Sequence, residues 1–148
     1  MASYLEDFEL GKSVLTAPRS VTKDDVMAFV ELSGDDNPMH TDAVFARNTP
    51  IGQCVAHGLL VLSMATGLSA KTGHLAGTAL AFLGIEDWRF CAPVFFGDSI
   101  RLRWTVVEKR LTSDGSAGVL KRHMEILNQH DKVVQSGVFV TLVKTKGA

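Results

Sequence analysis

The sequence has few cysteines and no excess of either charge. Cys54 and Cys91 have neither metal-ligand spacing nor an obvious redox partner, so we interpret both as small apolar core residues in a reducing compartment. Lys and Arg total 15 and Asp and Glu total 16, for a net charge of −1. This balance argues against nucleic-acid or anionic-membrane binding as the main role, although a local patch can still hold a phosphate. The dinucleotide-binding, Walker and zinc motifs are also missing.

A long apolar span and an export signal are missing as well. Residues 48–70 contain no Asp, Glu, Lys or Arg, which raises the question of a transmembrane helix. A proline, glycines and polar residues interrupt the first half of this stretch, and the apolar run from Leu59 has only the length of a buried core helix. The acidic N-terminal segment lacks the core of a signal peptide. We therefore expect a soluble, cytoplasmic protein with no membrane partner.

The composition that is present is that of one globular domain. The chain has 148 residues, of which 46% are hydrophobic and 21% charged, and these values exclude a disordered or fibrous protein. A chain of this length buries roughly 68–70% of its unfolded surface, enough for a core without staples. There are no internal repeats, low-complexity tracts or linkers, so we expect a single domain over residues 1–148.

The first half of the chain reads as helices and loops. Thr22 is a suitable N-cap for a helix that ends at Gly34, and Thr41 or Asp42 can start a short helix that ends before Pro50. A third helix is expected from near His57 to Ala70. Its apolar residues do not keep to one stripe, which predicts a helix buried nearly all round.

The second half reads as strands. Residues 79–90 favour a strand, and apolar and polar residues alternate from Ile100 to Val106. Further strands are expected over 119–127, with Leu120, Met124 and Ile126 on one face, and after a turn at 128–132, with Val134, Val138, Val140 and Leu142 on one face. An early strand is expected around 13–21. The pattern indicates an α+β protein in which a curved antiparallel sheet wraps a long central apolar helix, as in the hot-dog fold, although other α+β folds share these elements.

The segment Ser33–His40 carries the strongest chemical signal. Its Gly, Asp, Asn and Pro residues predict a tight turn, and that turn can bring Asp35 and His40 together. A carboxylate and an imidazole at one site suit general acid–base chemistry near neutral pH. The alternative is that Asp36 and Asn37 merely shape a turn between helices and that His40 is a surface or capping residue.

The segment Val55–Leu60 begins the apolar helix. A helix N-terminus presents unpaired N–H groups, and Gly58 has no side chain to block the approach of a ligand carbonyl. The alternative is that Gly58 only allows close packing and that His57 is a capping or packing histidine.

Together these segments resemble a known family. Residues 33–42 with Phe45 and Ala46, then residues 55–60, and then residues 90–98 are similar to successive blocks of the MaoC-like dehydratases and (R)-specific enoyl-CoA hydratases. The resemblance covers roughly residues 8 to 143 and implies a hot-dog fold, a homodimer, and reversible syn addition of water to a trans-2-enoyl thioester.

The resemblance also implies roles for single residues. Asp35 and His40 match the catalytic pair that holds and activates the water, and Gly58 matches the glycine whose N–H binds the thioester oxygen. Asn37 holds the loop in shape. Thr66 matches a helix hydroxyl that is a serine in other members. No cofactor and no metal is implied, and coenzyme A enters only as the carrier of the substrate.

Several alternatives stay open. The carrier can be coenzyme A or acyl carrier protein, and other readings are a hot-dog thioesterase or a non-catalytic acyl-binding subunit. The intact block from Asp35 to His40 favours the hydratase. Candidate partners for the coenzyme A phosphates are Arg89, Arg101, Arg103, Lys121 and Arg122, although alternating arginines more often form a solvated face. Candidate tunnel-lining residues are Phe82, Leu83 and Trp88.

Overall fold

The computed structural model describes residues 2–148. Its helices are the short 3₁₀ turn η1 (Leu5–Asp7) and the α-helices α1 (Lys23–Ser33), α2 (Pro38–Thr41), α3 (Ala43–Arg47) and α4 (Gly58–Lys71). Its strands are β1 (Ser13–Leu15), β2 (Arg19–Ser20), β3 (Ala79–Phe90), β4 (Ser99–Leu111), β5 (Ala117–Asn128) and β6 (Val133–Lys144). Among the described residues, no helix has the length and apolar character needed to cross a membrane.

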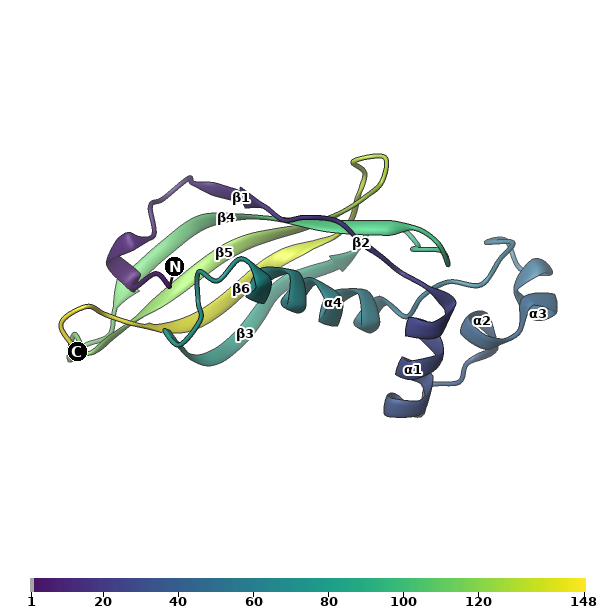
Figure 1. Cartoon of the computed structure of the whole chain (residues 1–148), viewed down its shortest axis with the longest axis horizontal. Coiled ribbons are helices and arrows are strands. Elements are labelled where there is room, and N and C mark those ends of the chain that lie inside the picture. Colours follow the sequence, from purple (N-terminus) through teal and green to yellow (C-terminus); the bar gives the residue numbers. More distant parts are fainter. Residues whose placement is uncertain (1) are drawn as a thin grey trace.

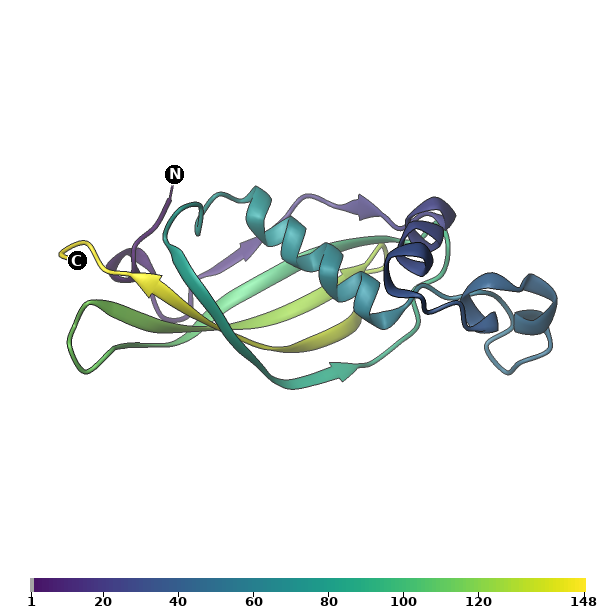
Figure 2. The same ribbon diagram turned by 90° about the horizontal axis from the view of Figure 1, so that it is seen from below.

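One antiparallel sheet curves around α4 (Figures 1 and 2). The strand order is β1-β4-β5-β6-β3, with β2 also paired to β4, so that β3 forms one edge. The three long pairings β4–β5, β5–β6 and β3–β6 join strands of 12 or 13 residues. The α+β arrangement predicted from the sequence is confirmed.

The core lies between α4 and the strands that follow the predicted alternation. Buried side chains on β4 and β5 meet the buried side of α4, which contributes Val61, Met64, Ala65 and Leu68. The strand residues in this layer are Ile100, Leu102, Trp104, Val106, Leu120, Met124 and Ile126. Their burial confirms the faces predicted for the two strands.

The face predicted for β6 is wrong beyond its first residue. Phe139, Thr141 and Val143 are buried, whereas Val138, Val140 and Leu142 are only half-buried on the other face. The cause is a register shift. Ile126 pairs with Gln135 and Leu127 pairs with residue 133, so that residue 134 is the extra residue of a bulge and the alternation changes phase there.

Helix α4 is not buried all round in a single chain. Leu59, Ser63, Thr66 and Ala70 form an exposed stripe along it, and Leu59 is 60% exposed. The prediction of an all-round buried helix is therefore wrong for the protomer.

Residues 22–55 form an arm that extends beyond one end of the sheet and includes α1, α2 and α3 (Figure 1). The predicted capping of α1 is confirmed, because Thr22 and Asp25 form a reciprocal capping box, and Gly34 ends α1 in the left-handed conformation with φ of 78°. Within 33–40 the turn prediction is only partly right. Asn37 caps the single helical turn α2, and Pro38 occupies its first position.

Candidate functional site

The loop after α1 places Asp35. Its backbone N–H donates to Ser33 Oγ at 3.1 Å, and its own Oδ1 accepts the N–H of Asn37 at 3.3 Å. The Asp35 side chain remains 52% exposed. Local hydrogen bonds therefore fix the loop while leaving the carboxylate open to a water or a ligand.

Helix α2 places His40. Asn37 Oδ1 accepts the N–H of Met39 at 3.1 Å, which agrees with the loop-shaping role predicted for Asn37. His40 lies one turn later, and its Nδ1 is 2.7 Å from the carbonyl oxygen of Val55. Because a carbonyl only accepts hydrogen bonds, Nδ1 must carry the proton. In neutral His40, Nε2 is then the unprotonated atom and can take a proton.

His57 joins the two groups, a role that the sequence reading did not assign to it. Its ring is 3% exposed and stacks on the His40 ring with a centroid separation of 3.7 Å. His57 Nε2 lies 2.9 Å from the carbonyl oxygen of Asp35 and therefore donates to it. The signal available in the sequence was the position of His57, directly before Gly58 at the start of α4.

Asp35, His40 and His57 form one cluster, in which one ring nitrogen of each histidine and one carboxylate oxygen lie within 4.8 Å of one another. A carboxylate and two imidazoles at this spacing can bind a metal ion. However, His57 Nε2 already donates to a carbonyl, and its Nδ1 is buried with no hydrogen-bond partner among the described residues. The Asp35 carboxylate and His40 Nε2 therefore remain as the groups that a water molecule can reach. That pair is suited to holding a water molecule and moving its proton.

Gly58 begins α4 beside this cluster. A Cβ atom at this position would lie 2.7 Å from the Phe90 ring, so the residue is small partly because Phe90 packs over it. This contact supports the close-packing reading of Gly58, whereas its binding of a thioester oxygen stays a prediction. Gln135 Nε2 donates to the Gly58 carbonyl at 3.0 Å, and Trp88 Nε1 donates to Gln135 at 3.0 Å. A cavity of about 390 Å³ adjoins Gly58, Phe90 and Gln135.

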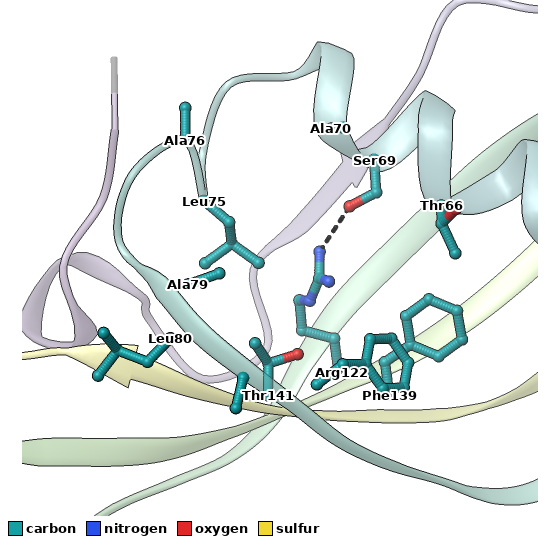
Figure 3. Close-up of a pocket in the computed structure, with 12 residues that line it drawn as sticks. Thr66, Ser69, Ala70, Leu75, Ala76, Ala79, Leu80, Arg122, Phe139 and Thr141 are labelled. Atoms are coloured by element: carbon teal, nitrogen blue, oxygen red, sulfur yellow. Dashed lines mark hydrogen bonds between the residues drawn. The ribbon is translucent and has the colours of Figure 1, made fainter.

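Thr66 does not meet the acid–base cluster within one chain. It lies eight residues after Gly58, about 12 Å along the helix axis, and its hydroxyl donates to the Ser63 carbonyl at 2.6 Å. It lines a second cavity of about 470 Å³, called here the Arg122 cavity, which lies along the second half of α4 (Figure 3). The other lining residues are Ser69, Ala70, Leu75, Ala76, Ala79, Leu80, Ala81, Phe82, Arg122, Phe139 and Thr141.

The residues that the sequence suggested for the tunnel and for the coenzyme A phosphates differ in burial and in ion pairing. Phe82 lines the Arg122 cavity, whereas Leu83 is exposed and Trp88 packs on Phe139. Three of the basic candidates are paired with carboxylates, and the pairs are Arg101–Asp131, Arg103–Glu125 and Lys121–Glu86. Arg89 is exposed and has no ion-pair partner among residues 2–148. Arg122 is buried, so the solvated-face reading is wrong for this residue.

Known proteins share both the sequence and the shape. The chain is 36% identical over 114 residues to Protein MaoC of Klebsiella aerogenes, covering 77% of this chain but 33% of that relative. It is 34% identical over 106 residues to the 3-hydroxybutyryl-CoA dehydratase of Methylorubrum extorquens, covering 71% of this chain and 64% of the relative. The chain thus spans less than two thirds of the length of either relative.

Solved structures also share the fold of this chain. The monoamine oxidase regulatory protein from Archaeoglobus fulgius superimposes with a TM-score of 0.92 at 34% identity, over 99% of this chain and 97% of that one. A Mycobacterium tuberculosis protein with a double hot-dog fold matches with a TM-score of 0.86 over 98% of this chain and 45% of that one. At 19% identity, that second likeness is one of fold alone. The predicted hot-dog fold is confirmed.

The family follows from a match over most of the chain. Residues 7–126 fit the model of the MaoC-like domain. That stretch contains Asp35, His40, His57 and Gly58 together with α4 and most of the sheet. The chain therefore belongs to the MaoC-like family of dehydratases and hydratases.

Proposed function

We propose that the protein catalyses the reversible syn hydration of trans-2-enoyl-CoA to (3R)-3-hydroxyacyl-CoA. The observation that carries this proposal is the meeting of Asp35 and His40 beside the N-terminus of α4. Membership of a dehydratase and hydratase family supports it. No cofactor is needed, because water addition to an enoyl thioester requires only proton transfer and charge stabilisation.

The chemistry divides between two parts of the site. The Asp35 carboxylate and His40 Nε2 hold the water, remove one proton as oxygen attacks the β-carbon, and deliver one proton to the α-carbon. Negative charge then develops on the thioester oxygen. The free N–H groups of the first turn of α4, that of Gly58 first, stabilise this charge without reorganisation.

One assay separates this reaction from the two alternatives. Incubation with crotonyl-CoA should remove the enoyl absorbance without releasing a free thiol. Release of thiol would instead identify a thioesterase, and binding without either change would identify an acyl-binding subunit. The same assay with the crotonyl thioester of acyl carrier protein compares the two carriers, and we expect the coenzyme A thioester to be hydrated faster.

We further propose that the working protein is a homodimer formed through the β3 edge. Apolar side chains on this edge strand are exposed in the protomer, and they are Leu80, Phe82, Leu83 and Ile85. The exposed stripe of α4 adds Leu59. A long edge strand with open backbone groups and exposed apolar side chains favours pairing with a second copy.

The substitution Leu83→Arg should convert this dimer into a monomer. It places a charge at a β3 side chain that is 52% exposed in the protomer and that the second copy would cover. Light scattering should report the mass of one chain for Leu83→Arg and of two chains for the unaltered protein. Leu10→Arg is the matched control, because Leu10 is 63% exposed just before β1, at the opposite edge of the sheet from β3, and should leave the dimer intact. A dimeric Leu83→Arg variant would place the interface elsewhere.

A further inference from the structure

Arg122 is a buried cation at the wall of a cavity. It projects from β5 toward α4, where its Nη1 donates to Ser69 Oγ at 3.0 Å (Figure 3). The side chain is 4% exposed and lines the Arg122 cavity. The guanidinium also lies 5.1 Å from the centre of the Trp104 ring. Among the described residues, its Nε has no hydrogen-bond partner.

No carboxylate within residues 2–148 lies within 4.0 Å of this guanidinium. Arg101 and Arg103, on the neighbouring strand, each have one. Burial lowers the pKa of Arg122 to about 10, which still leaves it positively charged at neutral pH. A buried charge with one neutral hydrogen bond and an aromatic face is costly, and an anion entering the cavity would relieve that cost.

The lining of the cavity suits an acyl chain whose far end carries a polar group. Alanine, leucine and phenylalanine side chains make up most of its wall, and hydroxyl groups of Thr66, Ser69 and Thr141 interrupt it. The guanidinium presents a planar set of donors that fits a carboxylate in two-point contact. An entirely hydrocarbon ligand would leave these donors unpaired.

Gly58 and the Arg122 cavity lie at opposite ends of β3. Phe90, at one end, packs over Gly58, whereas Ala79–Phe82, at the other end, line the Arg122 cavity. If two copies pair antiparallel along β3, the cavity end of one copy lies beside the Gly58 end of the other. An acyl group that reacts at one copy's acid–base cluster can then extend into the other copy's Arg122 cavity.

We propose that Arg122 binds a carboxylate at the far end of the acyl group, so that the preferred substrates are monothioesters of unsaturated dicarboxylic acids. This inference rests on the proposed hydratase function and names its substrate class. Ser69, whose Oγ accepts from Arg122, and Thr141 can donate the remaining hydrogen bonds to that carboxylate.

A binding experiment tests the inference without turnover. Calorimetry would compare the saturated mono-CoA thioester of a dicarboxylic acid with the thioester of the monocarboxylic acid of equal length, over a series of lengths. We expect the dicarboxylic ligand to bind about 10- to 100-fold more tightly at the best length, and Arg122→Met to remove that preference. Arg103→Met is the matched control, because Arg103 is paired with Glu125 at the surface, and it should keep the preference.

Two further experiments identify the anion that binds and the role of Arg122. Dephospho-CoA thioesters, which lack the 3′-phosphate, should lose the same factor of affinity for the unaltered protein and for Arg122→Met. A 3′-phosphate contribution that disappears in Arg122→Met would mean that Arg122 binds this phosphate, which would overturn the proposal. Arg122→Lys should retain part of the preference. If Arg122→Met does not fold, the two ligands can still be compared on the unaltered protein. Equal affinities at every chain length would then refute the carboxylate subsite.

The outcomes separate this inference from the proposed function. Hydration of crotonyl-CoA together with equal rates for dicarboxylic and monocarboxylic enoyl thioesters would overturn the Arg122 subsite alone. A preference in binding with no hydration of either ligand would retain the subsite and overturn the hydratase.

Discussion

Replacement of Asp35 by Asn should lower the rate of enoyl-CoA hydration by about 10²- to 10⁴-fold, the usual contribution of a general acid–base group. The amide preserves the size of the side chain and the hydrogen bond that Oδ1 accepts from Asn37 N–H. It cannot take the proton of the attacking water. The loss should therefore fall on kcat, with only a small change in KM for crotonyl-CoA.

Asp36 supplies a matched control for this experiment. It is the next residue in the same loop and is also exposed, but it lies outside the cluster formed by Asp35, His40 and His57. Asp36→Asn changes the net charge by the same amount and should hydrate crotonyl-CoA within about twofold of the unaltered rate, as expected for a surface change. An Asp35→Asn variant as active as Asp36→Asn would remove Asp35 from the mechanism.

Replacement of His40 by Gln should produce a loss of similar size, about 10²- to 10⁴-fold. The glutamine amide can still donate toward the Val55 carbonyl, which His40 Nδ1 contacts at 2.7 Å. It cannot supply the basic nitrogen that His40 presents at Nε2. The combined Asp35→Asn and His40→Gln variant should be little slower than either single variant, because residues that act as a unit are not additive.

Stopped-flow absorbance at saturating crotonyl-CoA would measure this loss. His130→Gln is the control, because His130 is an exposed residue in the turn between β5 and β6. Circular dichroism would verify that His40→Gln keeps its fold, since His40 also stacks on His57. Retention of the full rate by a folded His40→Gln variant would exclude His40 as the proton-transfer group.

Local sequence rules predicted most of the elements that place the site. The Thr22 cap, the Gly34 stop and the start of α4 all follow from residues within a few positions of each boundary. The inward faces of β4 and β5 follow from a period of two. The phase of β6 does not, because a bulge at residue 134 depends on its pairing with β5 rather than on its own sequence.

The site itself was only partly visible in the sequence. Spacing suggested that Asp35 and His40 converge, but the stacking of His57 on His40 requires the arm to fold back on the start of α4. Arg122 was readable in principle. It lies between Leu120 and Met124 on the inward face of β5, and only its charge suggested solvent.

The arm has a further consequence for how the site opens. Only Val26 and Ala46 are buried within residues 22–55, so this segment has little apolar burial of its own to hold it in place. The hydrogen bond from His57 to the Asp35 carbonyl and the stack of His57 on His40 join the arm to the start of α4 and form a latch there. Sub-global opening at this latch would separate the proton-transfer groups from Gly58, whose carbonyl is held to the sheet by Gln135. Amide hydrogen exchange should therefore begin in the arm well before it reaches β5, and product release can use that opening without unfolding the sheet.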